Sequence, residues 1–320
     1  MNGIFILILF EVISCVEPAA VKIVNLSCST GIDIVCRTQA VVVIDEIDLR
    51  TKFHLQGDDR LEPSSVKELH LAWIRFGIDK SFAEFSKLNV LKISHSSLTR
   101  LNGNIFQGLK ELKKLMLDGN EIKEVVGFSL PSLEKLFLAK NRIEILNQNS
   151  LNGLRSLKFL TLEDNQIFYI HKHSFKVNTL LEEMNLNRND LRFLEPETFS
   201  NNPTLKELSL NHNQIKNLHQ DIFNKNSNLE VLRLHHNKLH HLNKELFSSN
   251  LKLKWIELGE NQLNFIDPKV FQSLPQIEFI DLSSNSCIDE SFPDEMNFQH
   301  LIELTKRNCH FLSSYFYNFL

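Results

Sequence analysis

Glycine, proline and cysteine are scarce in this 320-residue chain, and neither sign of charge dominates it. Ten glycines and eight prolines are too few for a collagen-like or low-complexity chain, and they leave little room for phosphate-cradling loops. The formal net charge of −4 gives no basic footprint, so nucleic acid is not an expected partner. Because 42% of the residues are hydrophobic, we expect a large apolar core.

The sequence also lacks the motifs of common catalytic sites. It contains no G-x-S-x-G, no H-E-x-x-H, no phosphate-binding loop and no C-x-x-C. Beyond the N-terminus, no segment approaches the ~18 consecutive apolar residues of a membrane-spanning helix. The sequence therefore predicts no enzyme and no transmembrane segment, and it indicates neither a cofactor nor a metal site.

Residues 1–15 read as a secretory signal peptide. An apolar run extends from Ile4 to Phe10 and small residues follow, although no Lys or Arg precedes the run and Glu11 interrupts it. Cleavage after Cys15 leaves four cysteines, an even number, and Asn25 begins an N-glycosylation sequon. We expect a secreted protein glycosylated at Asn25. The alternative is a mildly hydrophobic cytosolic N-terminus.

Leucine and asparagine are abundant, with 51 and 32 residues, and many of them follow one repeat. The template L-x-x-L-x-L-x-x-N-x-L is met, for example, by Leu112, Leu115, Leu117, Asn120 and Ile122. One step between template asparagines is 21 residues and six are 24, and Ser96 and Ile74 take this position in two earlier, degenerate units. The template asparagines are Asn120, Asn141, Asn165, Asn189, Asn213, Asn237, Asn261 and Asn285. Periods of this length indicate stacked repeats, about ten in number.

On these residues the chain resembles the leucine-rich repeat family, specifically its extracellular 24-residue class. The resemblance implies an α/β solenoid, a horseshoe with a concave parallel β-sheet, an irregular or short-helical convex side and disulfide caps at both ends. We divide the chain into a signal peptide at 1–15, an N-terminal cap at 16–65, repeats at 66–287, and a C-terminal cap and tail at 288–320. A further degenerate repeat at 44–65 is an open alternative.

The expected disulfides follow from this implied architecture. Ten strands about 4.8 Å apart span roughly 45 Å, whereas bonded cysteines have Cα atoms within about 7 Å of each other. Cys28–Cys36 and Cys287–Cys309 are therefore the expected pairs. Residues 294–307 contain Met296, Leu301, Ile302 and Leu304, which are consistent with a short covering helix in the C-terminal cap.

Each repeated residue type has an expected structural role. Leucines at alternate strand positions point inward, and an inward asparagine amide can satisfy backbone groups of the turn that follows each strand. A column of aromatic residues lies ten residues after the asparagine position, and we interpret it as a packed convex spine rather than a ligand site. Its members are Phe106, Phe175, Phe199, Phe223, Phe247 and Phe271.

Two apolar clusters fall on the solvent-facing positions of the expected concave sheet. The first is Met116, Phe137 and Phe159, and the second is Val231, Trp255 and Phe279. Exposed aromatic residues of this kind often anchor protein interfaces. The alternatives are cover by a cap or glycan, or an incidental arrangement.

Histidines also recur at one repeat position. His212 and His236 share it, and His235, His240 and His241 lie nearby. Neighbours of this kind can bind a metal or respond to pH, but solvated polar decoration is the simpler interpretation.

The sequence thus favours a secreted leucine-rich repeat protein that binds another protein through its concave face, in recognition, innate immunity or cell adhesion. The alternatives are the truncated ectodomain of a membrane receptor, and a matrix or inhibitor protein. A homodimer is a further open alternative for the partner.

Overall fold

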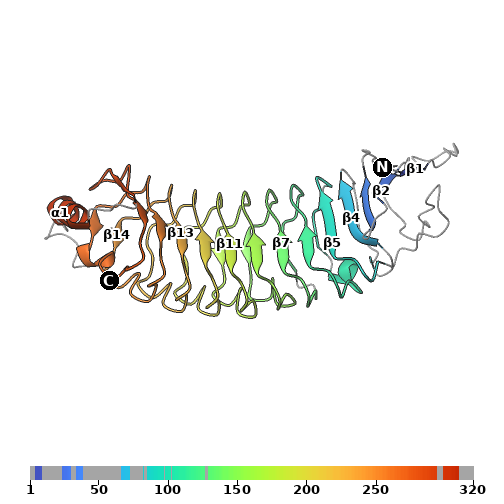
Figure 1. Ribbon diagram of the computed structural model, residues 1–320, viewed down its shortest axis with the longest axis horizontal. Coiled ribbons are helices and arrows are strands. Elements are labelled where there is room, and N and C mark those ends of the chain that lie inside the picture. Colours follow the sequence, from blue (N-terminus) through green and yellow to red (C-terminus); the bar gives the residue numbers. More distant parts are fainter. Residues whose placement is uncertain are drawn as a thin grey trace. The chain divides into compact units, whose positions relative to one another are not determined.

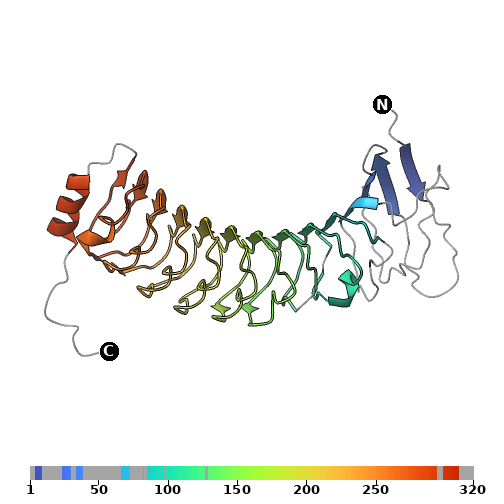
Figure 2. The same ribbon diagram turned by 60° about the horizontal axis from the view of Figure 1, so that its bottom comes forward.

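The computed structural model comprises two compact units, Met1–Asn165 (unit 1) and Gln166–Leu320 (unit 2). Within each unit, the strands line one side and irregular segments return along the other side (Figures 1 and 2). The structure describes residues 4–8, 24–29, 34–38, 66–72, 82, 85–96, 98–101, 103–126, 129–293 and 298–309.

The sheet of unit 1 begins with antiparallel strands and continues with parallel ones. β1 pairs with β2, and β2 with β3, in antiparallel fashion. From β3 onward each strand runs parallel to the next. The strands are β1 (Ile4–Ile8), β2 (Val24–Ser29), β3 (Ile34–Thr38), β4 (Val66–Ala72), β5 (Val90–Ser94), β6 (Lys114–Met116), β7 (Lys135–Phe137) and β9 (Phe159–Thr161). The two-residue strand β8 (Ile145–Leu146) and the 3-10 helix η2 (Gly103–Phe106) belong to the return segments.

The sheet of unit 2 is parallel up to its last strand. Its parallel strands are β11 (Glu183–Asn185), β12 (Glu207–Ser209), β13 (Val231–Arg233), β15 (Trp255–Glu257) and β17 (Phe279–Asp281). The return segments contain β10 (Tyr169–Ile170), β14 (His241–Leu242), β16 (Phe265–Ile266) and the 3-10 helix η3 (Pro268–Val270), and β14 pairs with β16.

Alternation along each short strand builds the core. In β6, Leu115 is fully buried whereas Lys114 and Met116 on either side are partly exposed, and the other three-residue strands bury their middle residue in the same way. On the return side of unit 2, successive buried phenylalanines stack with ring centroids 6.1–6.4 Å apart, from Phe175 to Phe271. The stacking confirms the interpretation of this column as a packed spine.

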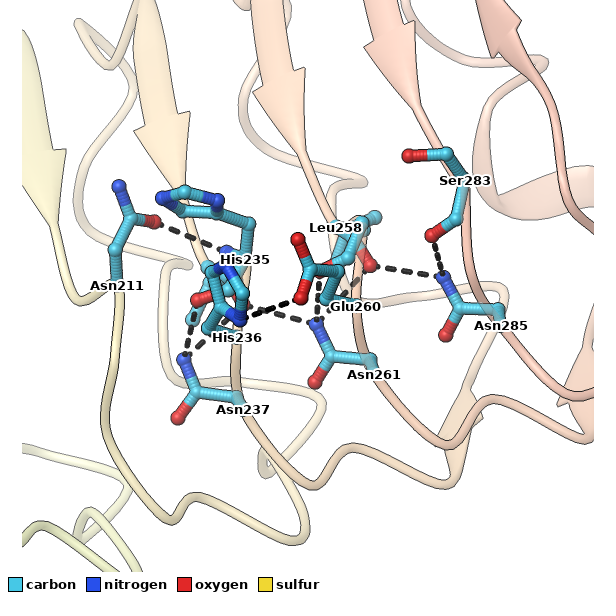
Figure 3. A network of polar contacts seen from close by, with 11 residues as sticks. Asn211, His235, His236, Asn237, Leu258, Glu260, Asn261, Ser283 and Asn285 are labelled. Atoms are coloured by element: carbon cyan, nitrogen blue, oxygen red, sulfur yellow. Dashed lines mark hydrogen bonds and ion pairs between the residues drawn. The ribbon is translucent and has the colours of Figure 1, made fainter.

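The template asparagines hold each turn to the turn before it. The Oδ1 atom of Asn237 accepts a hydrogen bond from the backbone N of Ile215, in the preceding repeat, at 3.0 Å. Its Nδ2 atom donates to the carbonyls of Leu210 and Leu234 at 2.9 and 3.0 Å. Asn261 and Asn285 repeat the arrangement (Figure 3). The side chain therefore pairs backbone groups that the end of a strand would otherwise leave buried and unpaired.

The C-terminal end of unit 2 is covered by three features. β18 (Ser291–Phe292) runs antiparallel to β17 and occupies the open edge of the sheet. The helix α1 (Phe298–Asn308) contacts η3 and buries Leu301 and Thr305, four residues apart on one face. A disulfide joins Cys287 to Cys309, the expected C-terminal pair. Ile302 and Leu304, which were also expected in this helix, are partly exposed.

The predicted fold class, an α/β leucine-rich repeat solenoid, is confirmed by the stacked parallel strands and their irregular return segments. The register of the antiparallel strands β2 and β3 places Cys28 opposite Cys36, as the expected N-terminal pair requires. The side chains of Cys28, Cys36 and Asn25 lie outside the description, as do residues 44–65 and the tail 310–320. The signal peptide at 1–15 stays a prediction, and the backbone of Ile4–Ile8 is strand β1.

Candidate interaction surfaces

The outward side chains of each sheet lie in columns that the strand register aligns. In unit 1, Val90, Lys114, Lys135 and Phe159 are successive partners, and in unit 2 the column starting at Glu183 ends at Phe279. We call the outward residues of β4, β5, β6, β7 and β9 the strand face of unit 1. Those of β11, β12, β13, β15 and β17 form the strand face of unit 2. Both sets of predicted binding residues lie on these faces.

The structure brings together the first predicted cluster on the strand face of unit 1. The rings of Phe137 and Phe159 lie with centroids 4.9 Å apart, and Met116 is the direct strand partner of Phe137. All three side chains are partly exposed. The Nζ atom of Lys114 lies 5.1 Å from the centroid of the Phe137 ring, within range of a cation–π interaction.

The second cluster forms a stacked aromatic pair on the strand face of unit 2. The Trp255 and Phe279 rings are stacked with centroids 4.1 Å apart, and Val231 is the strand partner of Trp255. Trp255 is 37% exposed, and its indole N–H donates to Glu257 Oε1 at 2.8 Å. That hydrogen bond helps to fix the ring's orientation, and the side chain keeps more than a third of its surface exposed. The α1 cap is not needed to position this pair, because its partners come from the strands themselves.

Charged side chains surround the Trp255–Phe279 pair. Arg233 contacts Glu207 at 3.4 Å and Glu257 at 3.5 Å, so it bridges two carboxylates on neighbouring strands. Asp281 accepts hydrogen bonds from Ser283 and Ser291. Burial raises the pKa of Asp281, but these hydrogen bonds outweigh burial, so the pKa is lowered overall.

The histidines gather at the turns that follow β12 and β13. The rings of His212 and His236 stack with centroids 4.2 Å apart, and His235 lies 5.0 Å from His212. His236 Nδ1 is 2.7 Å from Glu260 Oε2 (Figure 3). Burial lowers the pKa of His212 and of His235, and the neighbouring His236 lowers both further, against the opposing effect of nearby carboxylates.

Among the described residues, the ring contacts of this group join His212, His235 and His236 and do not include His240 or His241. His240 and His241 come after the turn that holds His235 and His236, and His241 lies in β14. Burial lowers the pKa of His241, and the neighbouring His240 lowers it further. Across the described ranges, no group of three or more His, Cys, Asp or Glu side chains is arranged to hold a metal ion. In the same ranges, no helix is long and apolar enough to cross a membrane.

Two features were not predicted from the sequence. On the return side of unit 2, Phe168 and Phe193 are 46% and 53% exposed, and the Tyr169 ring lies 6.1 Å from that of Phe193. A second buried asparagine column follows the phenylalanine spine, in which Asn202 and Asn226 donate to carbonyls of the preceding repeat. The second column has a clear sequence signal, since asparagine recurs three residues after four successive phenylalanines.

Stacked parallel strands and an asparagine ladder define a repeat solenoid. A family model described as leucine rich repeat matches residues 78–122, 123–167, 164–215, 179–238, 203–250 and 227–286. These matches cover most of the chain, and the protein belongs to the leucine-rich repeat family.

Individual relatives match smaller parts of the chain. A segment of 96 residues is 33% identical to lumican of Gallus gallus and 35% identical to lumican of Rattus norvegicus. The segment spans 29% of this chain and 28% of each lumican.

Two solved structures share the fold over longer stretches. The crystal structure of a TLR13–ssRNA13 complex is similar with a TM-score of 0.63 and 25% identity, over 69% of this chain and 32% of that chain. An internalin (inlF) of Listeria monocytogenes is similar with a TM-score of 0.60 and 18% identity, over 85% of this chain and 71% of that one, which shows the fold alone.

Proposed function

We propose that this protein is a secreted recognition protein that binds another protein through its strand faces. The observation that carries the proposal is the stacked Trp255–Phe279 pair, which is held by the sheet and partly exposed to solvent. Rigid, partly exposed aromatic side chains with a polar rim are typical of the anchor residues of protein interfaces. The Phe137–Phe159 pair on unit 1 has the same character.

Secretion is supported by two independent features. The apolar run from Ile4 to Phe10 is typical of a signal peptide, and the Cys287–Cys309 disulfide is of a kind that persists in oxidising compartments. Expression of the full chain in cultured animal cells tests this. We expect the protein in the medium with an N-terminus created by cleavage after Cys15. We also expect the secreted protein to carry an N-linked glycan that a glycosidase removes and that the Asn25→Gln variant lacks. Retention of an uncleaved chain inside the cells would contradict secretion.

Capture of partners from extracellular medium tests the binding role. We expect Trp255→Ala/Phe279→Ala and Phe137→Ala/Phe159→Ala to lose captured protein, by about tenfold in affinity or more, with melting temperatures close to that of the unaltered protein. Phe168→Ala/Phe193→Ala is the matched control, because it removes two exposed aromatic rings that are not on a strand face.

The captured protein distinguishes the forms that this function can take. A membrane protein indicates part of a receptor assembly, a matrix component indicates a structural role, and a secreted enzyme that loses activity indicates an inhibitor. Capture of the chain by itself indicates a homodimer. Equal capture by both aromatic variants and the control would contradict binding through the strand faces.

A further inference from the structure

Three lysines lie on adjacent strands of the strand face of unit 1. Lys92 is on β5, Lys114 on β6 and Lys135 on β7, and Lys114 is the direct strand partner of Lys135. Like charges placed directly opposite each other destabilise a sheet. The opposed lysines therefore lower the stability of the sheet, so stability does not account for their presence.

No carboxylate neutralises these lysines within ion-pair distance in the described part of unit 1. Asp118 interacts electrostatically with Lys92 without forming an ion pair with it. The Asp118 carboxylate also accepts a hydrogen bond from the backbone N of Ala139 at 2.9 Å. Glu134, which precedes β7, is 3.1 Å from Lys158 instead.

The strand face of unit 2 shows that the fold does not require unpaired cations. Arg233 bridges two carboxylates on the same face. In unit 2 the column equivalent to Lys114 and Lys135 carries no cation, and the one cation in the column equivalent to Lys92, Arg233, is matched by carboxylates. The lysine excess on unit 1 is therefore a local property of that surface.

The lysines alternate with apolar side chains instead of forming a continuous charged stripe. Lys92 is the strand partner of Met116, and Met116 is the partner of Phe137. The Nζ atom of Lys114 lies over the Phe137 ring. The surface therefore presents three lysines from adjacent strands, whose backbones are roughly 4.8 Å apart, beside the apolar side chains of Met116 and Phe137.

Building on the proposed function, we infer that the strand face of unit 1 binds an acidic segment of a partner protein, one that presents apolar side chains between its carboxylates. The carboxylates pair with Lys92, Lys114 and Lys135, and the apolar side chains cover Met116, Phe137 and Phe159. Burial of the aromatic surface strengthens the ion pairs, because it removes them from water.

The same geometry disfavours the other polyanions. Single-stranded nucleic acid binds by stacking bases on open aromatic faces, but Phe137 has Lys114 over one face and is packed against Phe159. A sulfated polysaccharide has the charges but no apolar groups to cover the three apolar side chains. A peptide supplies both.

Binding of synthetic probes to the mature chain tests the inference. The probe is a fluorescent peptide that alternates glutamate with leucine and phenylalanine, and its control has glutamine in place of each glutamate. We expect the acidic peptide to bind more tightly by about tenfold or more, and its affinity to fall between about 50 mM and about 300 mM sodium chloride. A short single-stranded RNA and a heparin fragment are measured in parallel.

Two lysine variants then locate the binding surface. We expect Lys92→Gln/Lys114→Gln/Lys135→Gln to lose at least about tenfold in affinity for the acidic peptide with an unchanged or higher melting temperature, because like charges are removed. The control, Lys110→Gln/Lys123→Gln/Lys140→Gln, makes the same change in net charge at exposed positions outside the strand face and is expected to bind normally.

Three outcomes would overturn the inference: no binding of the acidic peptide, equal binding by the two triple variants, or tighter binding of RNA or heparin. Failure of this inference can be distinguished from failure of the proposed function. If Phe137→Ala/Phe159→Ala loses the captured partner while the strand-face lysine variant keeps it, the face binds protein and only the acidic chemistry is wrong.

Discussion

The template asparagine uses its amide as both acceptor and donor. Its oxygen accepts from one backbone N–H, and its nitrogen donates to carbonyls of its own repeat and of the preceding one. Aspartate has the same shape but lacks the donors, so it tests the ladder without creating a cavity.

Asn237→Asp is expected to lower the free energy of unfolding by about 2–3 kcal/mol, because the carbonyls of Leu210 and Leu234 lose their partner. Chemical denaturation measures the change. The control is Asn264→Asp, an exposed asparagine outside the ladder, which is expected to change stability by less than about 0.5 kcal/mol. Equal effects at the two positions would show that the ladder adds nothing.

The residue before each ladder position has a left-handed backbone. Eight residues other than glycine adopt φ between 51° and 55° there, and Gly119 occupies the equivalent place before Asn120. The eight are His95, Lys140, Asp164, Arg188, His212, His236, Glu260 and Ser284. This conformation costs roughly 1–2 kcal/mol for a residue with a Cβ atom. The turn therefore stores strain in almost every repeat.

Lys140→Gly is expected to raise stability by about 0.5–1 kcal/mol, because Lys140 is exposed and its φ of 55° suits glycine. Lys123→Gly, at an exposed position where φ is not positive, is expected to lower stability by a similar amount. Thermal unfolding of the two variants is the measurement, and a fall in both melting temperatures would contradict the argument.

At the scale of elements, the turns after β12 and β13 place three histidine rings together. The pKa values of His212 and His235 are lowered, primarily by burial and also by the other histidines, and for His212 by Arg188. Glu257, Glu260 and Asp281 act in the opposite direction on His235. The folded protein therefore binds fewer protons at these side chains than the unfolded chain does.

Stability of unit 2 is expected to fall as the pH is lowered. The contribution of His212 and His235 is complete above the unfolded-state pKa of about 6.5 and is lost as the pH drops through their lower folded-state values. Melting temperatures between about pH 7.5 and about pH 5 measure the loss. His212→Gln is expected to lose less over this range than the unaltered protein, and an identical slope would remove His212 from the explanation.

Sequence reasoning predicted the strands and their facing well, because a side-chain period of two within a 24-residue period leaves one consistent arrangement. It placed Phe137 near Phe159, and Trp255 near Phe279, for that reason. It missed the left-handed residues, since His, Lys, Asp, Arg, Glu and Ser share only polarity, which does not predict this backbone conformation, and the turn imposes it. Phe168 and Phe193 were missed because exposure on the return side depends on how each irregular segment packs.

At the scale of the whole molecule, the two strand faces differ in charge. We count the outward residues of each face with the residue before each strand. By this count unit 1 carries five lysines and two glutamates, whereas unit 2 carries seven carboxylates and three cations. The small net charge of the chain thus conceals two surfaces of opposite sign, each suited to different partner segments.

The covered end of unit 2 is expected to depend on its disulfide. Cys287–Cys309 closes a loop of 22 residues, and a cross-link of this size contributes about 3 kcal/mol to stability. We expect Cys287→Ser/Cys309→Ser to lower the melting temperature. The double substitution removes only this disulfide, and the unaltered protein is the reference. An unchanged melting temperature would mean that α1 and β18 hold the end without it.

The asparagine ladder also governs how such a protein can change in length. The 21-residue step to Asn141 keeps the same bonds as the 24-residue steps, because Asn141 accepts from Ile122 and donates to Leu117 and Leu138. The ladder therefore requires one asparagine in each turn and does not depend on the number of residues in the return segment. Insertions and deletions in the return segments leave it intact, and so does the gain or loss of a whole repeat. A change of even one residue between a strand and its asparagine breaks it. Inherited variation in length should accordingly be confined to the return side, while the strand faces keep a fixed geometry on which side chains alone are free to vary.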